Sequence, residues 1–397
     1  MRRRSSGAIT FGGAALIGSW AFGSTPLAVV GLGFVFAGLL ARAWARIAGA
    51  SIEIERRLLP GEHVEWSDIA VEVRMRCRRR LPLGSVVLRQ RLGGIDRGLQ
   101  LHKSHARIVF SEVRRGRHEL GSLQAVLTDP LGLERVEQRL DERIAVLVRP
   151  RIPQLTSVFT IHGARDAGAA RSRYRRSTGF DIHAVRDYAP GEPLRSVHWP
   201  STARRGSLMV KELDDTPRDD LAVILDQDED GVAGPPKRWS FDAAVRAAGA
   251  LALVHLHWNR RVVIVGSAPG CDTVRIRSVG NDWGVALDSL ASVMPAAGAR
   301  VDRVLRDPAT AVARAREIIV VTGRPDRAVD ALLELHRGGR AVSLVVVAAE
   351  TFAGRPRRLP DPASLRAAAQ GVPVAVIAAD TPIEAALAGR LEGVAGA

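Results

Sequence analysis

Two apolar runs without a charged side chain open the hydrophobic pattern of the chain. They cover residues 7–23 (GAITFGGAALIGSWAFG) and 26–41 (PLAVVGLGFVFAGLLA), and a Ser-Thr-Pro turn at 24–26 joins them. A membrane-spanning helix needs about 20 apolar residues, and Trp20 and Trp44 suit interfacial positions that would extend the two runs. We therefore predict a transmembrane helical hairpin over residues 1–48.

A cleaved signal peptide would also begin with arginines and an apolar run. Here a second apolar run follows at once, and no small-residue cleavage site precedes a polar mature start, so the hairpin is favoured. Basic residues flank both outer ends, at positions 2–4 and at Arg42 and Arg46. The positive-inside rule then predicts a two-pass protein of the inner or plasma membrane, with its soluble part in the cytoplasm.

Glycines are frequent in both apolar runs. They would let the two helices approach closely, within the hairpin or between copies, or they reflect the general frequency of glycine in membrane helices. These glycines are Gly12, Gly13, Gly18, Gly31, Gly33 and Gly38.

Between residues 49 and 150 the apolar period changes to two, which is the period of a half-buried strand. Six or so short segments show it, among them SIEIERRL (51–58), SVVLRQRL (85–92) and RIAVLVRP (143–150). Turn signals such as Pro60-Gly61 and Gly93-Gly94 separate the segments. The pattern predicts a β-rich, sandwich-like module, with a small antiparallel barrel as the alternative.

From residue 219 onward, continuous apolar runs alternate with helical patterns. LAVILD (221–226), RVVIVG (261–266), EIIVVTG (317–323), AVSLVVVA (341–348) and VPVAVIA (372–378) are typical of parallel strands that are buried on both faces. Helical patterns cover 240–258, 326–337, 362–369 and 383–391. The fold class is therefore α/β, with a doubly wound parallel sheet over residues 219–397.

Carboxylates follow the first strand of this predicted sheet at alternate positions, Asp226, Asp228 and Asp230. Ligands of such sheets bind at the carboxyl ends of the strands, and alternate carboxylates could hold Mg²⁺ or Ca²⁺ there. The spacing resembles a degenerate metal-ion-dependent adhesion motif of von Willebrand factor A domains, with Thr322-Gly323 at the end of a later strand in place of Thr-Asp-Gly. With a metal bound here, the chain would be a divalent-metal-dependent adhesion module, which is an alternative function. A solvated acidic loop is the other interpretation, and it is favoured over a metal site.

Composition limits the other function classes. Hydrophobic residues make up 46% and charged residues 25% of the chain, which excludes a disordered or a multi-spanning membrane protein. The whole net charge of +15 lies in residues 1–218, and this fits a nucleic-acid surface or a position close to anionic lipid. No nucleic-acid-binding motif accompanies the arginines, and the only cysteines, Cys77 and Cys271, have no metal-ligand spacing, so neither nucleic acid nor a disulfide is expected.

Residues 151–218 form a segment that is crowded with chemically active side chains. A hydrolase could use His183 or His198 with Asp187 and Ser201, but no Gly-x-Ser-x-Gly turn surrounds this serine. Arginine–carboxylate pairing explains more of the composition, because guanidinium groups bind carboxylates in a bidentate way. The expected pairs join Arg186, Arg195 and Arg204 to Asp181, Asp187, Glu192 or Glu212.

The run from Phe180 to Glu212 resembles the signature of the domain of unknown function 58 family. The positions that match are Phe180, Arg186, Tyr188, Pro190, Gly191, Arg195, Trp199, Ala203, Arg204, Leu208 and Val210. RRGRHELG (114–121), DPLGL (129–133) and the apolar N-terminus extend the resemblance over most of the chain. The chain departs from the pattern at Ile182-His183, Glu192-Pro193 and Val197-His198, where the family carries other residues, including aspartates.

The resemblance implies a non-enzymatic scaffold or adaptor with a von Willebrand A-like domain. It also implies a MoxR-type AAA+ ATPase as partner, and other membrane proteins such as transglutaminase-like ones nearby. The signature then serves as a fixed junction or docking surface. Its candidate interface residues are Arg186, Tyr188, Pro190, Gly191, Arg195, Trp199, Ser201 and Arg204, whereas the candidate metal ligands are Asp226, Asp228, Asp230 and Thr322.

Overall fold

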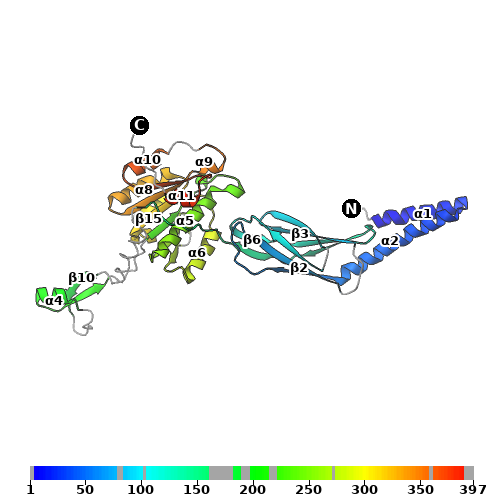
Figure 1. Ribbon diagram of the computed structural model, residues 1–397, viewed down its shortest axis with the longest axis horizontal. Helices are drawn as coiled ribbons and strands as arrows, with labels where there is room; N and C mark the ends of the chain where they lie inside the picture. Colours follow the sequence, from blue (N-terminus) through cyan, green and yellow to red (C-terminus); the bar gives the residue numbers. More distant parts are fainter. Residues whose placement is uncertain are drawn as a thin grey trace. The chain divides into compact units, whose positions relative to one another are not determined.

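The structure is a computed structural model that describes residues 4–77, 84–101, 104–160, 182–188, 197–213, 221–270, 273–356 and 361–388. Of the two cysteines, Cys271 and the side chain of Cys77 lie outside this description. The chain divides into two compact units, of which one ends at Arg149 and the other begins at Pro150 (Figure 1).

The first unit starts with two helices, α1 (Arg4–Phe22) and α2 (Thr25–Ser51). They pack closely because three of the glycines lie at their contact. A Cβ on Gly12 would come within 2.7 Å of the Gly31 carbonyl oxygen, and one on Gly38 within 2.5 Å of Ile9. A Cβ on Gly13 or Gly33 would meet no atom within 4 Å, so these two glycines are not needed for the packing of the helices.

Helix α2 is long and apolar enough to span a membrane, and among the helices of the described residues it is the one that meets this test. Its last turns belong to the β-rich part of the unit. Trp44 and Ala48 are buried in the same core as the strands, and Ser51 is followed directly by strand β1. Trp44 therefore does not take the lipid-interface position that the sequence suggested, whereas Trp20 is 89% exposed.

Antiparallel strands make up the rest of this unit, in two sheets with the orders β1-β2-β5 and β8-β7-β3-β6-β9, and β4 pairs with β3. Side chains from both sheets enter one hydrophobic core, which confirms the β-rich module. The strands are β1 (Ile52–Leu58), β2 (Ile69–Cys77), β3 (Ser85–Leu92), β4 (Ile95–Leu101), β5 (His105–Phe110), β6 (Gly116–Leu120), β7 (Leu123–Thr128), β8 (Arg135–Leu140) and β9 (Ile144–Val148).

The second unit contains a six-stranded sheet with the order β14-β13-β12-β15-β16-β17. All neighbours are parallel except β14, which is antiparallel at one edge. This is a doubly wound order in which the direction of winding reverses between β12 and β15. The strands are β12 (Leu221–Leu225), β13 (Val262–Gly266), β14 (Thr273–Ile276), β15 (Glu317–Thr322), β16 (Ala341–Val347) and β17 (Val374–Ile377).

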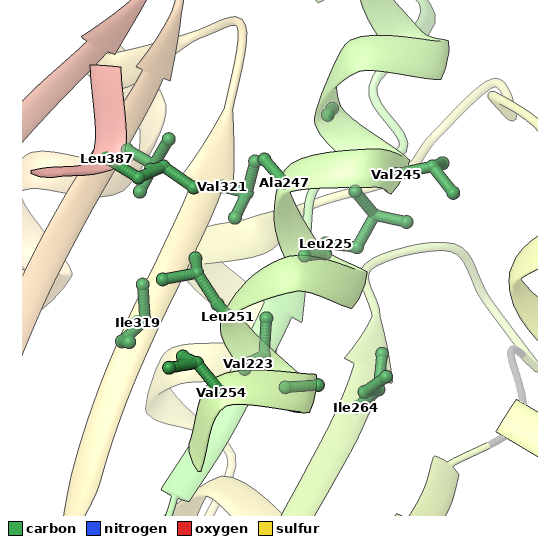
Figure 2. Close-up of a cluster of buried hydrophobic side chains, with 14 of the residues drawn as sticks. Val223, Leu225, Val245, Ala247, Leu251, Val254, Ile264, Ile319, Val321 and Leu387 are labelled. Atoms are coloured by element: carbon green, nitrogen blue, oxygen red, sulfur yellow. The ribbon is translucent and has the colours of Figure 1, made fainter. Parts of the chain in front are cut away.

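Both faces of the sheet are covered, which explains the continuous apolar runs of its strands. On one face, Val245, Ala247 and Leu251 of α5 share a buried cluster with Val223 and Ile319 of the sheet (Figure 2). The other face packs against α7, α8 and α10. The helices are α5 (Ser240–His257), α6 (Asn281–Ser292), α7 (Val301–Arg306), α8 (Pro325–Arg337), α9 (Ala349–Phe352), α10 (Pro362–Ala369) and α11 (Ile383–Ala388), with 3₁₀ turns η2 (Glu229–Gly231), η3 (Pro236–Arg238) and η4 (Ala311–Arg314).

A small antiparallel pair, β10 (Ile182–Asp187) and β11 (Met209–Leu213), precedes the sheet in the sequence, with helix α4 (Trp199–Arg205) between its strands. These three elements lie within residues 151–218, the segment that carries the family signature.

A buried ion pair lies at the opposite end of the strands from Asp226. Arg260 Nη1 donates to Glu317 Oε2 over 2.7 Å, and the two side chains are 4% and 2% exposed. The same nitrogen lies 2.6 Å from His255 Nδ1.

Replacing Glu317 by Ala should lower the free energy of unfolding by about 3–5 kcal/mol, because it leaves a buried guanidinium without its carboxylate. Asp330→Ala removes an exposed pair with Arg366 and should have a much smaller effect, since water already solvates both partners. Urea denaturation followed by circular dichroism measures both losses. Equal losses in the two variants would contradict this assignment.

Candidate functional site

The buried carboxylate of Asp226 joins three strand ends of the sheet. Asp226 directly follows β12, Thr322 ends β15, and Ser267 follows β13. Thr322 Oγ1 donates to Asp226 Oδ2 over 2.6 Å, and Ser267 Oγ donates to Asp226 Oδ1 over 2.9 Å. The Asp228 N–H also donates to Oδ1, over 3.2 Å.

These contacts lie at the point where the sheet reverses its winding, since β12 and β15 are neighbours there. The carboxylate is 6% exposed and both hydroxyl-bearing residues are buried. Burial raises the pKa of Asp226 above its ordinary value near 3.8, and the hydrogen bonds from Thr322, Asp228 and Ser267 oppose this increase. The effect of burial on the pKa is larger than that of the hydrogen bonds, so the pKa is raised overall.

The loop after β12 continues with two further carboxylates that bind arginine. Arg327, in the first turn of α8, donates through Nη1 to Asp228 Oδ2 and through Nη2 to Asp230 Oδ2, the latter over 3.0 Å. Arg324 pairs with Asp326 and approaches Asp230 to 3.9 Å. The structure thus brings all four candidate metal ligands to one edge of the sheet, and it adds Ser267 and Arg327, which sequence reasoning missed.

A cavity of about 660 Å³ lies beside this cluster, at the carboxyl ends of β15, β16 and β17. Its charged lining consists of Arg324, Asp326, Glu350, Arg355 and Asp361. Because both signs of charge are present, the lining favours no single class of ligand.

The signature segment has its own local geometry around α4. His198 is the N-cap residue of α4, and its Nδ1 accepts the Ser201 N–H over 3.3 Å and lies 2.8 Å from the Ser201 hydroxyl. Gly206 closes the helix with a φ of 72°, and its N–H donates to the Thr202 carbonyl. Trp199 is 61% exposed, and Arg204 is also exposed.

The structure separates Asp187 from His198 by a strand. Arg186 in β10 and Val197 both pair with Val210 of β11, so they lie along its two edges. Asp187 follows Arg186, and His198 N donates to Met209 O. Of the proposed hydrolase residues, His198 and Ser201 are therefore brought together, while the side chain of His183 lies outside the described residues.

Several signature residues also fall outside the description. Pro190, Gly191, Arg195, Asp181 and Glu192 are not described, and of Arg186 and Glu212 the backbone alone is described. Tyr188 is half-buried, and its N–H donates to Leu208 O over 2.9 Å. The expected arginine–carboxylate pairs of this segment stay predictions.

Residues 184–349 match the model of a family described as protein of unknown function DUF58. The match begins in β10 and ends in α9, so it contains α4, Asp226 and Thr322. It confirms the family resemblance over this segment, which is less than half of the chain. No curated protein matches the chain.

Three solved structures show low similarity. A conjugative transposon lipoprotein from Bacteroides eggerthii is 14% identical, with 23% of this chain and 95% of that chain covered and a TM-score of 0.17. The CARDB domain of a Pyrococcus furiosus protein in complex with di-metal ions is 12% identical, with 25% and 94% covered and a TM-score of 0.18. Cwp6 from Clostridium difficile is 11% identical, with 74% and 37% covered and a TM-score of 0.14. At these TM-scores the similarities carry no conclusion.

The raised pKa of Asp226 predicts a pH dependence of stability. The folded state keeps a proton on this carboxyl at pH values where the unfolded chain has lost it, so this contribution is complete below the ordinary pKa near 3.8 and is lost as the pH rises through the folded-state pKa. The free energy of unfolding of the wild type, relative to Asp226→Asn, should therefore fall as the pH rises from the ordinary pKa near 3.8 through the folded-state pKa.

Denaturant titrations at several pH values measure this difference. Asp330→Asn is the matched control, because Asp330 lies in an exposed pair on the same sheet domain. A difference between wild type and Asp226→Asn that stays constant over the whole pH range contradicts the prediction.

Proposed function

We propose that this chain, whose residues 184–349 match the DUF58 family, is a membrane-anchored, non-enzymatic scaffold. It presents a von Willebrand A-like α/β domain to a protein partner on the cytoplasmic side. The observation that carries the proposal is the apolar surface of the two N-terminal helices.

Large apolar side chains cover the outside of α1 and α2. Trp20 is 89% exposed, Phe22 84%, Val29 73%, Ile17 72% and Leu32 65%. Soluble proteins rarely expose a continuous apolar surface of this kind, because exposing each such side chain to water is unfavourable in free energy. Insertion into a bilayer removes this penalty. The part of α2 that precedes Trp44 is about 28 Å long, close to the hydrocarbon core of about 30 Å.

Contacts at the ends of the helix pair support a two-pass arrangement. Arg42 Nη2, on the C-terminal half of α2, donates to Ser6 Oγ near the start of α1 over 2.9 Å. The Ser5 N–H donates to the Leu133 carbonyl of the β module over 3.2 Å. Both outer ends of the pair therefore lie beside the β module, and their arginines favour the cytoplasmic face.

We propose a von Willebrand A-like fold for the α/β domain, and its doubly wound strand order, its antiparallel β14 and the strand-end positions of Asp226 and Thr322 support this proposal. The family resemblance implies a MoxR-type AAA+ ATPase as its partner, and other membrane proteins nearby. Helix α4 is the docking element that we propose, because it lies in the matched segment and exposes Trp199 and Arg204. Tryptophan and arginine dominate the binding energy of many protein interfaces.

A hydrolase is the second candidate function, and the contact between His198 and Ser201 is the observation that favours it. The same contact has a simpler role, because His198 Nδ1 accepts the Ser201 N–H and so caps α4. Because the helix cap already explains this contact, we rank the hydrolase below the scaffold that docks through α4.

The proposed anchor predicts that the full chain stays in the membrane pellet after alkaline carbonate extraction. Replacing Leu32 and Phe36 by Arg should release it, because each charge in the middle of a spanning helix costs about 2.5–3.5 kcal/mol. Leu99→Arg, at a partly exposed position of β4, should leave the chain in the pellet. Wild-type protein in the carbonate supernatant would remove the anchor.

The proposed docking predicts that the chain binds a MoxR-type AAA+ ATPase of the same organism, with ATP or a non-hydrolysable analogue present. Trp199→Ala should weaken this binding by about tenfold or more, because an exposed tryptophan at an interface contributes strongly. Val285→Ala is the matched control, since Val285 is 62% exposed on α6.

Ser201→Ala separates the two candidate functions in the same assay. A scaffold keeps its cellular phenotype in this variant as long as the chain still binds the ATPase, whereas a hydrolase that uses Ser201 as nucleophile loses the phenotype even where binding is kept. Failure of the wild type to bind the ATPase in any nucleotide state would exclude the partnership.

A further inference from the structure

The loop after β12 carries the carboxylates of Asp228 and Asp230, whose negative charges need a nearby cation. Asp226 and Asp228 are each 6% exposed, and Asp230 follows on the same loop. Carboxylates at such a strand end are compensated by a cation, either a divalent metal with oxygen ligands or a basic side chain.

We propose that the chain supplies this cation itself, and that the guanidinium of Arg327 holds the loop after β12 in the position that a divalent metal would otherwise take. Its two terminal nitrogens bind two different carboxylates, Asp228 through Nη1 and Asp230 through Nη2. A planar guanidinium suits this double contact better than a single ammonium group would. The inference does not depend on the proposed scaffold function.

The position of Arg327 in its helix supports this assignment. It lies in the first turn of α8, where the positive end of the helix dipole disfavours a cation. Two carboxylates from the loop after β12 offset that disadvantage. The guanidinium is therefore held by contacts with Asp228 and Asp230 rather than by its own helix.

The oxygen atoms that a metal would need are already engaged. Asp226 Oδ2 accepts from Thr322, and Oδ1 accepts from Ser267 and from the Asp228 N–H. Thr322 Oγ1 accepts the Arg324 N–H over 2.8 Å, while Asp228 Oδ1 accepts the Asp230 N–H over 3.1 Å. Among the described residues, no group of three His, Cys, Asp or Glu is placed to hold a metal ion.

Close backbone packing also fills the space where a further ligand would stand. A Cβ on Gly323 would lie 2.1 Å from the Gly231 carbonyl oxygen, so the residue after Thr322 cannot carry a side chain unless the loop moves. A Cβ on Gly231 would meet Arg324 Cγ at 3.0 Å. The Asp of a Thr-Asp-Gly sequence therefore has no room here, and the resident metal of an adhesion-type site does not fit these residues.

The consequence is that this edge of the sheet works without a divalent metal. A partner that docks here meets a salt-bridged loop rather than an open metal coordination position. The divalent-metal adhesion module, one of the candidate functions from the sequence, is thereby disfavoured on geometric grounds.

The test uses the full chain in detergent micelles, with its thermal midpoint measured in EDTA and in Mg²⁺, Ca²⁺ or Mn²⁺. Wild type should shift by less than about 1 °C between these conditions. Arg327→Gln should unfold at least about 3 °C below the matched control Arg366→Gln, which loses an exposed pair on the same domain. In Arg327→Gln the freed carboxylates should bind Mn²⁺ weakly, so that 5 mM of this ion raises the midpoint by about 2 °C or more.

An Arg327→Gln variant that responds to Mn²⁺ no more than wild type does would overturn the proposal, as would equal stability of the two Arg→Gln variants. Calorimetry on the wild type gives an independent decision that does not require any Arg327 variant to fold. A saturable heat with Mg²⁺ or Ca²⁺ that disappears in Asp230→Asn shows a resident metal and refutes the inference, whereas no saturable heat supports it.

Discussion

The arrangement of the candidate site depends on one buried carboxylate. Asp226 accepts hydrogen bonds from Ser267 and Thr322, which lie at the ends of the strands on either side of β12. It also accepts one from the amide of Asp228 in its own loop. A carboxylate without these donors would be costly at this depth. The hydrogen bonds therefore fix the direction of the loop after β12, and this direction places Asp228 and Asp230 opposite α8, where Arg327 binds them. The winding of the sheet alone would not specify this pairing.

Much of the α/β domain could be predicted because its signals are strong and local. Continuous apolar runs such as LAVIL occur where both faces of a sheet are covered, and the structure places a strand at each of them. Asp226 and Thr322 could also be named, because the carboxyl ends of parallel strands meet at one edge. Ser267 follows a predicted strand in the same way, so this rule could have identified it. Arg327 carries no comparable signal, because its role depends on how α8 lies against the loop.

Edge strands account for most of the missed structure. Strand β4 (IDRGLQL) is almost fully exposed, and β8 (RVEQRL) buries little, so neither shows the apolar alternation of a half-buried strand. Residues 118–127 (HELGSLQAVL) look like one continuous strand in the sequence, but they hold the end of β6 and most of β7, on either side of Gly121. In the signature segment the density of charged residues hid β10, β11 and α4 in the same way. Its resemblance to a catalytic segment arises partly from capping, since a helix start brings a polar side chain at the N-cap beside the residue three positions later.

In the first unit, the helix pair fixes the orientation of the β module. Helix α2 passes into β1 without a linker, and Trp44 and Ala48 are buried in the core of the β module. At the other end of the pair, the turn that Asp129 stabilises accepts the Ser5 N–H, so α1 also returns to the module. With both helices attached in this way, tilting of the pair within a bilayer would tilt the β module by the same amount, because no flexible segment separates them. For the proposed scaffold, this means that the module's distance and angle to the membrane are set by helix packing, with Gly12, Gly31 and Gly38 at the contact. The glycines are then needed to hold the module's orientation as well as to stabilise the pair.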